Sequence, residues 1–190
     1  MKSLPCSPVR HRLALARTIA ALFLLAPLCL STFAAPPLTT IETLDLTRYV
    51  GVWHQIALLP NRFQSQCIGD TTAEYRLRAD GRLDVINRCR VANGGYDQVT
   101  GIARHAAHAT APGVFEVRFA PAWLSFLPWV WGDYWILALE PDYRAVLIGS
   151  PNRQYLWVLA REARLDEAAY SRYLELARAQ GFSIKDIVRG

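Results

Sequence analysis

The sequence predicts an all-β domain, an eight-stranded antiparallel up-and-down barrel with one C-terminal α-helix packed on its outside. Eight short stretches of apolar or alternating residues follow one another at close spacing, separated by turn residues, with no helical pattern between them. Such a run is typical of an antiparallel barrel or sandwich. A helical pattern appears only after the eighth stretch, and 190 residues are enough for one domain with its own core.

The first 35 residues differ from the rest and are typical of a secretory signal peptide. A basic start is followed by an apolar run at 18–30 and by small residues, which places cleavage near Ala34 or Ala35. The run is short for a membrane span, so an uncleaved anchor helix is the alternative. Acylation at Cys29 is a second alternative, although the preceding leucine is not the small residue that a lipoprotein signal needs. We expect export to the periplasm, with residues 36–41 as a tether and 42–190 as the domain.

The net charge argues against a nucleic-acid partner. Four basic and no acidic residues lie in positions 1–34, so the formal charge falls from +5 for the whole chain to +1 without them. The high isoelectric point therefore comes mostly from the signal, and no basic stripe with interleaved aromatic residues follows it.

The first strand is predicted at 53–59, where residues alternate between two faces that both carry apolar side chains. This alternation places Trp53, Gln55 and Ala57 on the inner face, and Ile56 and Leu58 outside. Gly51 permits a sharp entry into the strand. One helical turn at 44–49 precedes it, and a loop at 60–67 follows it.

The next two strands, 71–78 and 83–90, form a hairpin around a tight Asp80-Gly81 turn. With Ala79 opposite Arg82, paired residue numbers sum to about 161, which places Cys89 across from Thr72. Cys67 precedes this hairpin, and an even number of cysteines in an exported chain favours a disulfide. A Cys67–Cys89 bridge is therefore expected, and a free reactive thiol is the alternative.

The remaining strands are predicted at 98–105, 114–120, 133–140, 143–149 and 154–161. A helix should begin after Asp166, with Leu165 and Tyr170 as a hydrophobic staple, and end at Gly181. Its apolar stripe needs a surface to cover, and the outward apolar residues of the first strand can supply one. Residues 182–184 are expected to return to the barrel wall.

Three short motifs resemble the signatures of the lipocalin family, and the match spans residues 42–190. These are Gly51-Val52-Trp53 at the first strand, Pro141-Asp142-Tyr143 before the seventh, and Arg161 at the end of the eighth. The closest similarity is to bacterial outer-membrane lipocalins and the apolipoprotein D-like group, in Asp80-Gly81-x-Leu83-x-Val85-x-Asn87 and in residues 155–161. Pro141 departs from the family's usual Thr. The resemblance implies that Arg161 stacks on Trp53 and closes the barrel floor beside Gly51, as a structural contact.

An eight-stranded barrel has room for one small ligand, and this chain should line it with mostly apolar side chains. The resemblance points to Trp157 and Tyr134 as pocket walls, and the head group is expected near the rim at Tyr134, Tyr155 or Arg62. A solid core is the alternative. The predicted ligand-binding residues are Gln55, Ala57, Tyr75, Leu77, Val85, Asn87, Phe115, Val117, Phe119, Tyr134, Ile136, Tyr155 and Trp157.

Residues 121–131 form an almost wholly apolar segment whose two prolines exclude a central strand. The segment follows the fifth strand, so it should lie at the open mouth together with the 60–67 loop. Its mouth residues are predicted to be Trp123, Phe126, Trp129 and Trp131. The alternatives are a ligand portal or membrane contact on one hand, and a lid or homodimer contact on the other.

No cofactor and no metal are expected, because His54, His105 and His108 show no ligand spacing with acids or cysteines. Nucleophile-elbow and phosphate-binding motifs are absent from the sequence. The chain is therefore predicted to be an exported binding protein that stores or transports a fatty acid or lysophospholipid, and not an enzyme. The alternatives are a lipocalin-fold enzyme using a reactive cysteine on a lipid, and an interaction protein that docks through its tryptophan-rich loop.

Overall fold

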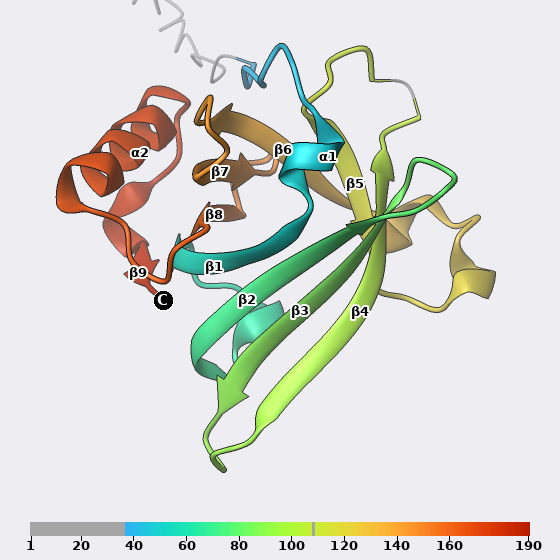
Figure 1. The fold of residues 1–190 in the computed structure, drawn as a ribbon, viewed down its shortest axis with the longest axis horizontal. Coiled ribbons are helices and arrows are strands. Elements are labelled where there is room, and N and C mark those ends of the chain that lie inside the picture. Colours follow the sequence, from blue (N-terminus) through green and yellow to red (C-terminus); the bar gives the residue numbers. More distant parts are fainter. Residues whose placement is uncertain (1–36, 108) are drawn as a thin grey trace, which may run out of the picture. The chain divides into compact units, whose positions relative to one another are not determined.

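The computed structural model describes residues 37–107 and 109–190, and shows a closed eight-stranded antiparallel barrel with one long helix outside it (Figure 1). The predicted fold class is confirmed. Each strand pairs with the next along the chain, and the first strand pairs with both the second and the eighth, which closes the barrel. The strands are β1 Gly51–Leu58, β2 Cys67–Leu77, β3 Leu83–Val91, β4 Tyr96–His105, β5 Val114–Arg118, β6 Gly132–Leu139, β7 Ala145–Gly149 and β8 Leu156–Ala160.

Two α-helices and four turns of 3-10 helix accompany these strands in the described residues. Helix α1 spans Leu46–Tyr49 at the closed end, and Asp45 caps it by accepting a hydrogen bond from the Thr47 amide. Helix α2 spans Glu167–Ala179 and begins at the predicted cap, Asp166, which accepts from the Ala169 amide at 2.8 Å. The 3-10 turns are η1 Arg62–Gln64, η2 Ala122–Leu124, η3 Pro128–Val130 and η4 Ile184–Asp186. Within the described residues, no helix is long and apolar enough to cross a membrane.

Apolar side chains form two separate clusters, one inside the barrel and one between its wall and α2. The inner cluster gathers around Trp53, and the outer cluster includes Tyr170, Tyr173 and Ala177 of the helix. The predicted helical stripe therefore covers the barrel wall as expected. Phe182 continues the outer cluster, since it is buried and its ring lies so close to Gly149 that a side chain there would collide with it.

A β-bulge in β1 reverses the predicted orientation of two residues. Pairing with β8 shifts register between Gln55 and Ala57, so one extra residue enters the strand. Ala57 then lies with Ile56 in the outer cluster, and Leu58 pairs with Trp157 on the inner face. The prediction that Ala57 faces inward and Leu58 outward was wrong.

The β2–β3 hairpin has a three-residue loop where a two-residue turn was predicted. The Arg78 amide donates to the carbonyl of Arg82 at 2.8 Å, and Gly81 takes a φ of +78° inside the loop. Paired residue numbers consequently sum to 160, so Arg88 rather than Cys89 lies opposite Thr72. Cys89 shares the inner face with Val85 and Asn87, as alternation predicts, and it is buried.

Both ends of the described chain are attached to the barrel. The predicted tether makes hydrogen bonds from its Thr39 amide to the Gln180 side chain, and from its Ile41 amide to the Ile136 carbonyl. A ninth strand that the sequence did not predict, β9 Val188–Arg189, pairs with the end of β1. The predicted signal peptide and Cys29 lie outside the described residues.

Candidate ligand-binding site

The closed end of the barrel is sealed by Arg161, whose guanidinium lies 3.9 Å from the centroid of the Trp53 ring. The guanidinium donates hydrogen bonds to backbone carbonyls of α1 and its flanks, including Arg48 at 2.7 Å and Val50 at 2.9 Å. Trp53 is fully buried. Gly51 has a φ of +98°, and a side chain there would lie 3.2 Å from Arg161. The floor is therefore a structural contact with no access to the barrel interior.

Three tyrosines fill the space directly above the floor. The Tyr134 hydroxyl lies 2.6 Å from that of Tyr49 and 2.8 Å from that of Tyr75, so the three phenols form one hydrogen-bonded chain. Burial raises the pKa of all three hydroxyls, that of Tyr75 to about 12. Tyr134 was expected to meet a head group at the rim, and the structure instead places it deep in the barrel.

Little room remains at this depth. The cavity bounded by the tyrosines, Leu83, Phe115 and Ile136 measures about 10 Å³, which is about the volume that one water molecule needs. The lower half of the barrel is thus packed, as the solid-core alternative predicted for the whole interior. Space for a ligand in the barrel is therefore confined to the upper half.

One wall of the upper half is an aromatic ladder that leads from the surface inward. The rings of Tyr155 and Trp157 are nearly parallel, with centroids 6.0 Å apart, and the Phe63 ring lies 5.6 Å from Tyr155. Phe63 belongs to the loop between β1 and β2 and is 57% exposed. The ladder therefore offers aromatic surface from the rim of the mouth to the interior.

A glutamine that the sequence analysis missed fixes this wall. Gln64 accepts a hydrogen bond from the Trp157 indole and donates one to Gln55, both at 2.8 Å. The polar ends of Gln55 and Trp157 are thereby satisfied, and the indole is held in one orientation. No periodic pattern indicated Gln64, because it lies in the single 3-10 turn of a loop.

The opposite wall remains accessible from the mouth. Val99 is 45% exposed, and its strand partner Asn87 is half-buried on the inner face. Phe119 is 38% exposed, and its ring lies against Gly101, where a Cβ would approach it to 2.6 Å. Residues 96–100 of β4 pair only with β3, because β5 ends at Arg118. The inner surface is therefore buried near the floor and open towards the mouth.

The predicted ligand-binding residues accordingly fall into three groups. At the base of the bore lie Tyr75, Val85, Phe115, Tyr134 and Ile136. In the accessible upper half lie Gln55, Asn87, Val117, Phe119, Tyr155 and Trp157. Two lie elsewhere: Ala57 packs under α2, and Leu77 is 44% exposed at the closed end of the hairpin.

The Cys67–Cys89 disulfide is formed, with the two Cα atoms 5.5 Å apart. It ties the start of β2 to the end of β3 beside the mouth. Neither sulfur is a thiolate in the disulfide, so neither Cys67 nor Cys89 can act as the nucleophile of a cysteine-dependent enzyme in this state. Within the part of the chain that is described, no three His, Cys, Asp or Glu side chains are grouped so that they could hold a metal ion.

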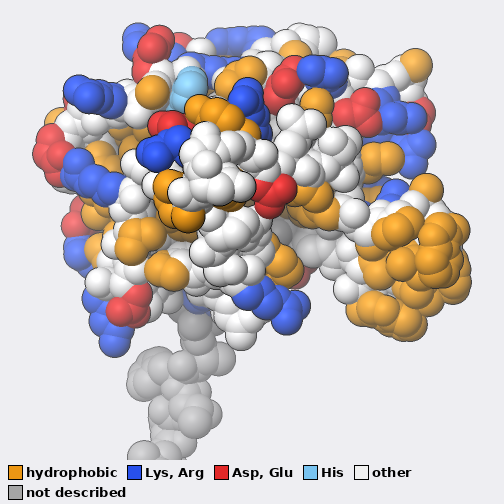
Figure 2. All heavy atoms as spheres, turned by 90° about the horizontal axis from the view of Figure 1, so that it is seen from below, with side chains coloured by type: hydrophobic (Ala, Val, Ile, Leu, Met, Phe, Trp, Pro, Cys, Tyr) orange, Lys and Arg blue, Asp and Glu red, His pale blue; other side chains and the backbone are white. Residues whose placement is uncertain are grey.

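The tryptophan-rich segment extends to one side of the barrel (Figure 1), and Figure 2 shows a cluster of hydrophobic side chains that protrudes on one side of the surface. Trp123, Phe126 and Trp129 are 72%, 75% and 76% exposed. Trp131 does not lie at the mouth with these three residues, as was predicted. Its ring is half-buried beneath the Arg104 guanidinium, 3.8 Å from the centroid, on the outer wall. We refer to residues 121–131 as the apolar knob.

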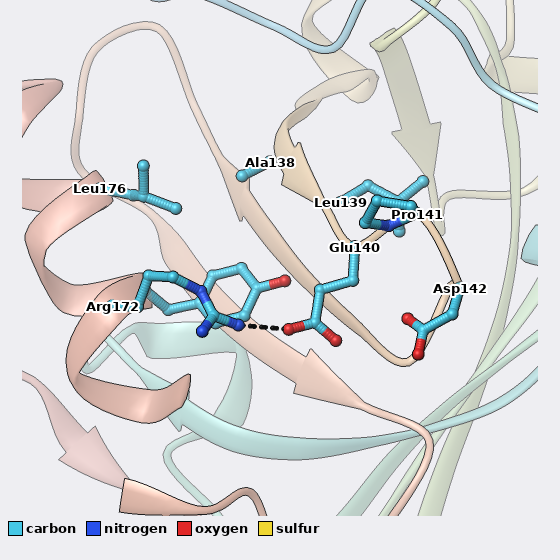
Figure 3. Close-up of a pocket in the computed structure, with 8 residues that line it drawn as sticks. Ala138, Leu139, Glu140, Pro141, Asp142, Arg172 and Leu176 are labelled. Atoms are coloured by element: carbon cyan, nitrogen blue, oxygen red, sulfur yellow. Dashed lines mark hydrogen bonds and ion pairs between the residues drawn. The ribbon is translucent and has the colours of Figure 1, made fainter. Parts of the chain in front are cut away.

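A second concave surface lies outside the barrel, between α2 and the β6–β7 turn (Figure 3). This groove has a volume of about 520 Å³ and was not predicted from the sequence. An ion pair between Glu140 and Arg172 crosses it. The groove is separate from the bore, and its charged lining differs from the apolar surface of the mouth.

Comparison with known proteins agrees with this architecture. The family profile of the lipocalin-like domain matches residues 44–189. Temperature-induced lipocalin-1 of Arabidopsis thaliana is 38% identical over 148 residues, covering 77% of this chain and 78% of the relative. Outer membrane lipoprotein Blc of Escherichia coli K12 is 31% identical over 156 residues, covering 80% and 83%.

Solved structures show the same fold at lower identity. Insecticyanin from the tobacco hornworm Manduca sexta superposes with a TM-score of 0.62 at 18% identity, covering 83% of this chain and 85% of that one. Together with the closed barrel and the Trp53–Arg161 floor, these matches show that the chain belongs to the lipocalin-like family.

Proposed function

We propose that this protein is an exported lipocalin that stores or transports a fatty acid or lysophospholipid for membrane maintenance, in the periplasm at the outer membrane. The observation that carries the proposal is the division of the barrel into a packed floor and an accessible apolar upper half. The relationship to a protein described as an outer membrane lipoprotein supports the location. Export depends on residues 1–35, and the intact mass of the secreted protein tests the export prediction. A mass that corresponds to cleavage near residue 35 supports export, and acylation at Cys29 would add the mass of lipid.

Binding requires only burial of the acyl chain. Each methylene removed from water contributes ~0.8 kcal/mol, so a chain that enters along Tyr155 and Trp157 gains affinity with every carbon buried. The tyrosine cluster limits the depth, since its cavity holds no more than about one water. Affinity should therefore rise with chain length and then level off. The polar head group stays at the rim, where Arg62 is the exposed cation next to Phe63.

Plugging the bore tests the proposal. Asn87 faces inward between Ala73 and Val99, so Asn87→Trp should occupy the space of about three methylenes and lower fatty-acid affinity roughly fiftyfold. Arg88→Trp is the matched control, because the neighbouring residue of the same strand faces outward and stacks on Tyr96 at 3.9 Å. Displacement of a fluorescent fatty acid measures both variants. Equal affinity of Asn87→Trp and the parent protein would contradict binding in the upper bore.

A further inference from the structure

The apolar knob is built as a rigid projection. The Trp131 indole donates to the Ser125 carbonyl at 2.9 Å, and its ring is held under Arg104, which is itself paired with Glu116. Five backbone amides in residues 121–131 donate within the segment, which has two prolines without an amide hydrogen. The cost of removing this backbone from water is therefore reduced.

The knob's exposed chemistry is almost purely apolar. Residues 121–131 contain no charged side chain, and Ser125 is the only hydroxyl among them. Trp123, Phe126 and Trp129 are each about three-quarters exposed. Tryptophan and phenylalanine with satisfied backbone are the groups that favour the boundary between head groups and acyl chains of a bilayer.

The size of the patch distinguishes a membrane from a protein partner. An aromatic side chain buries about 150–250 Å², so three of them bury at most about 750 Å² when complete, and less at the exposure observed here. A standard protein interface buries about 800 Å² on each partner and surrounds its core with a polar rim. The knob is too small for that and projects outward as a convex surface (Figure 2).

We propose that the knob inserts Trp123, Phe126 and Trp129 into the interfacial layer of a lipid bilayer and so holds the barrel mouth against the membrane. The knob begins two residues after Phe119, which lines the mouth, and next to the open edge of β4. Insertion therefore places the accessible half of the bore beside the lipid. This anchor is separate from ligand binding, although its use for lipid transfer rests on the proposed function.

Vesicles of phosphatidylethanolamine and phosphatidylglycerol test the anchor. The full chain, secreted and purified from the periplasm of a bacterial host, is compared with a Trp123→Ala, Phe126→Ala, Trp129→Ala variant by flotation. Each aromatic removed should lower partitioning about tenfold, so the triple variant should bind at least about a hundredfold more weakly. The control carries Val52→Ala, Leu77→Ala and Val188→Ala, which remove exposed apolar side chains away from the knob, and should bind like the parent protein. All chains share the same N-terminal segment, so its contribution cancels.

A second readout reports on the knob directly. Residues 1–36 contain no tryptophan, so quenching of tryptophan fluorescence by brominated lipid cannot come from them. The parent protein should be quenched on binding. Equal flotation of the parent protein and the triple variant would overturn the anchor, and so would a parent protein whose tryptophan fluorescence is not quenched. A parent protein that forms a dimer and binds no vesicles, with the dimer lost in the triple variant, would also overturn it. Fatty-acid affinity should be unchanged in the triple variant, so failure of ligand binding and failure of the anchor give different results.

Discussion

Replacing Arg161 should lower the stability of the protein without changing its affinity for a fatty acid. The guanidinium reaches five backbone carbonyls, from 2.7 Å at Arg48 to 3.3 Å at Tyr143, and covers the buried Trp53 ring. Arg161→Ala therefore removes the guanidinium donor from the carbonyls of Arg48 and Val50 and exposes one face of the indole, while the Tyr49 carbonyl keeps its bond from the Trp53 indole.

The magnitude follows from these contacts. A hydrogen bond to a charged group contributes about 1.5–3 kcal/mol, but the Arg161 contacts share three nitrogen atoms and do not add. The cation–π contact adds about 1 kcal/mol at this partial exposure. We expect Arg161→Ala to lower the free energy of unfolding by about 3 kcal/mol. Arg161→Lys should cost about 2 kcal/mol, because an ammonium cannot reach carbonyls on both sides of the ring.

Urea unfolding followed by tryptophan fluorescence measures this loss, and a Tm decrease of about 6–12 °C should accompany it. Arg76→Ala is the control, since Arg76 forms an ion pair with Glu74 while its side chain is 62% exposed, and such pairs contribute about 0–1 kcal/mol. If Arg161→Ala costs no more than Arg76→Ala, the floor does not hold the closed end of the barrel together. Fatty-acid affinity at temperatures where the variant is folded should stay within a few fold of the parent.

Two further predictions concern the disulfide and the tyrosine cluster. Reducing the Cys67–Cys89 bridge, which closes a loop of 22 residues, should lower the free energy of unfolding by about 3 kcal/mol in urea titrations with and without reductant; an unchanged midpoint would contradict this. Burial raises the pKa of Tyr49, Tyr75 and Tyr134 above the value of 10 of a free phenol, so the folded chain retains protons that the unfolded chain releases. Their contribution to stability is therefore complete below about pH 10 and is lost as the pH rises through the raised pKa values, that of Tyr75 at about 12. Absorbance at about 295 nm should show at least four phenols that resist ionisation at pH 11, the three of the cluster and Tyr173 of α2, whose pKa burial also raises. Titration of all tyrosines near pH 10 would refute the buried cluster.

The overall fold was predictable because each strand carries a period of two and is bounded by turn residues. The helix was equally clear, since Asp166 caps it as its sequence position predicts. The local geometry of the strands and turns was harder to predict from the sequence. The bulge at Gln55–Ala57 inserts one residue and reverses the side chains that follow it in β1, and the three-residue loop ending at Gly81 shifts the pairing of β2 with β3 by one residue. Alternation alone does not reveal such an insertion.

The depth of each inward side chain along the barrel axis could also not be predicted from the sequence. Alternation assigns Tyr134 to the inner face, but only the pairing of β5 with β6 fixes its height above the floor. Trp131 was grouped with the other tryptophans of its segment because they are close in sequence. Its different place depends on Arg104, which comes from another strand. Contacts between distant segments, rather than local pattern, decide these positions.

Native mass spectrometry of the protein purified from its native host, followed by lipid extraction, tests the central claim most directly. The account predicts a complex of one chain with one fatty acid or lysophospholipid, whose added mass disappears on extraction. The Asn87→Trp variant should carry much less of that mass, and Arg88→Trp should retain it. A folded protein that carries no lipid under these conditions, or equal lipid content in Asn87→Trp and the parent protein, would contradict a binding site in the upper half of the barrel.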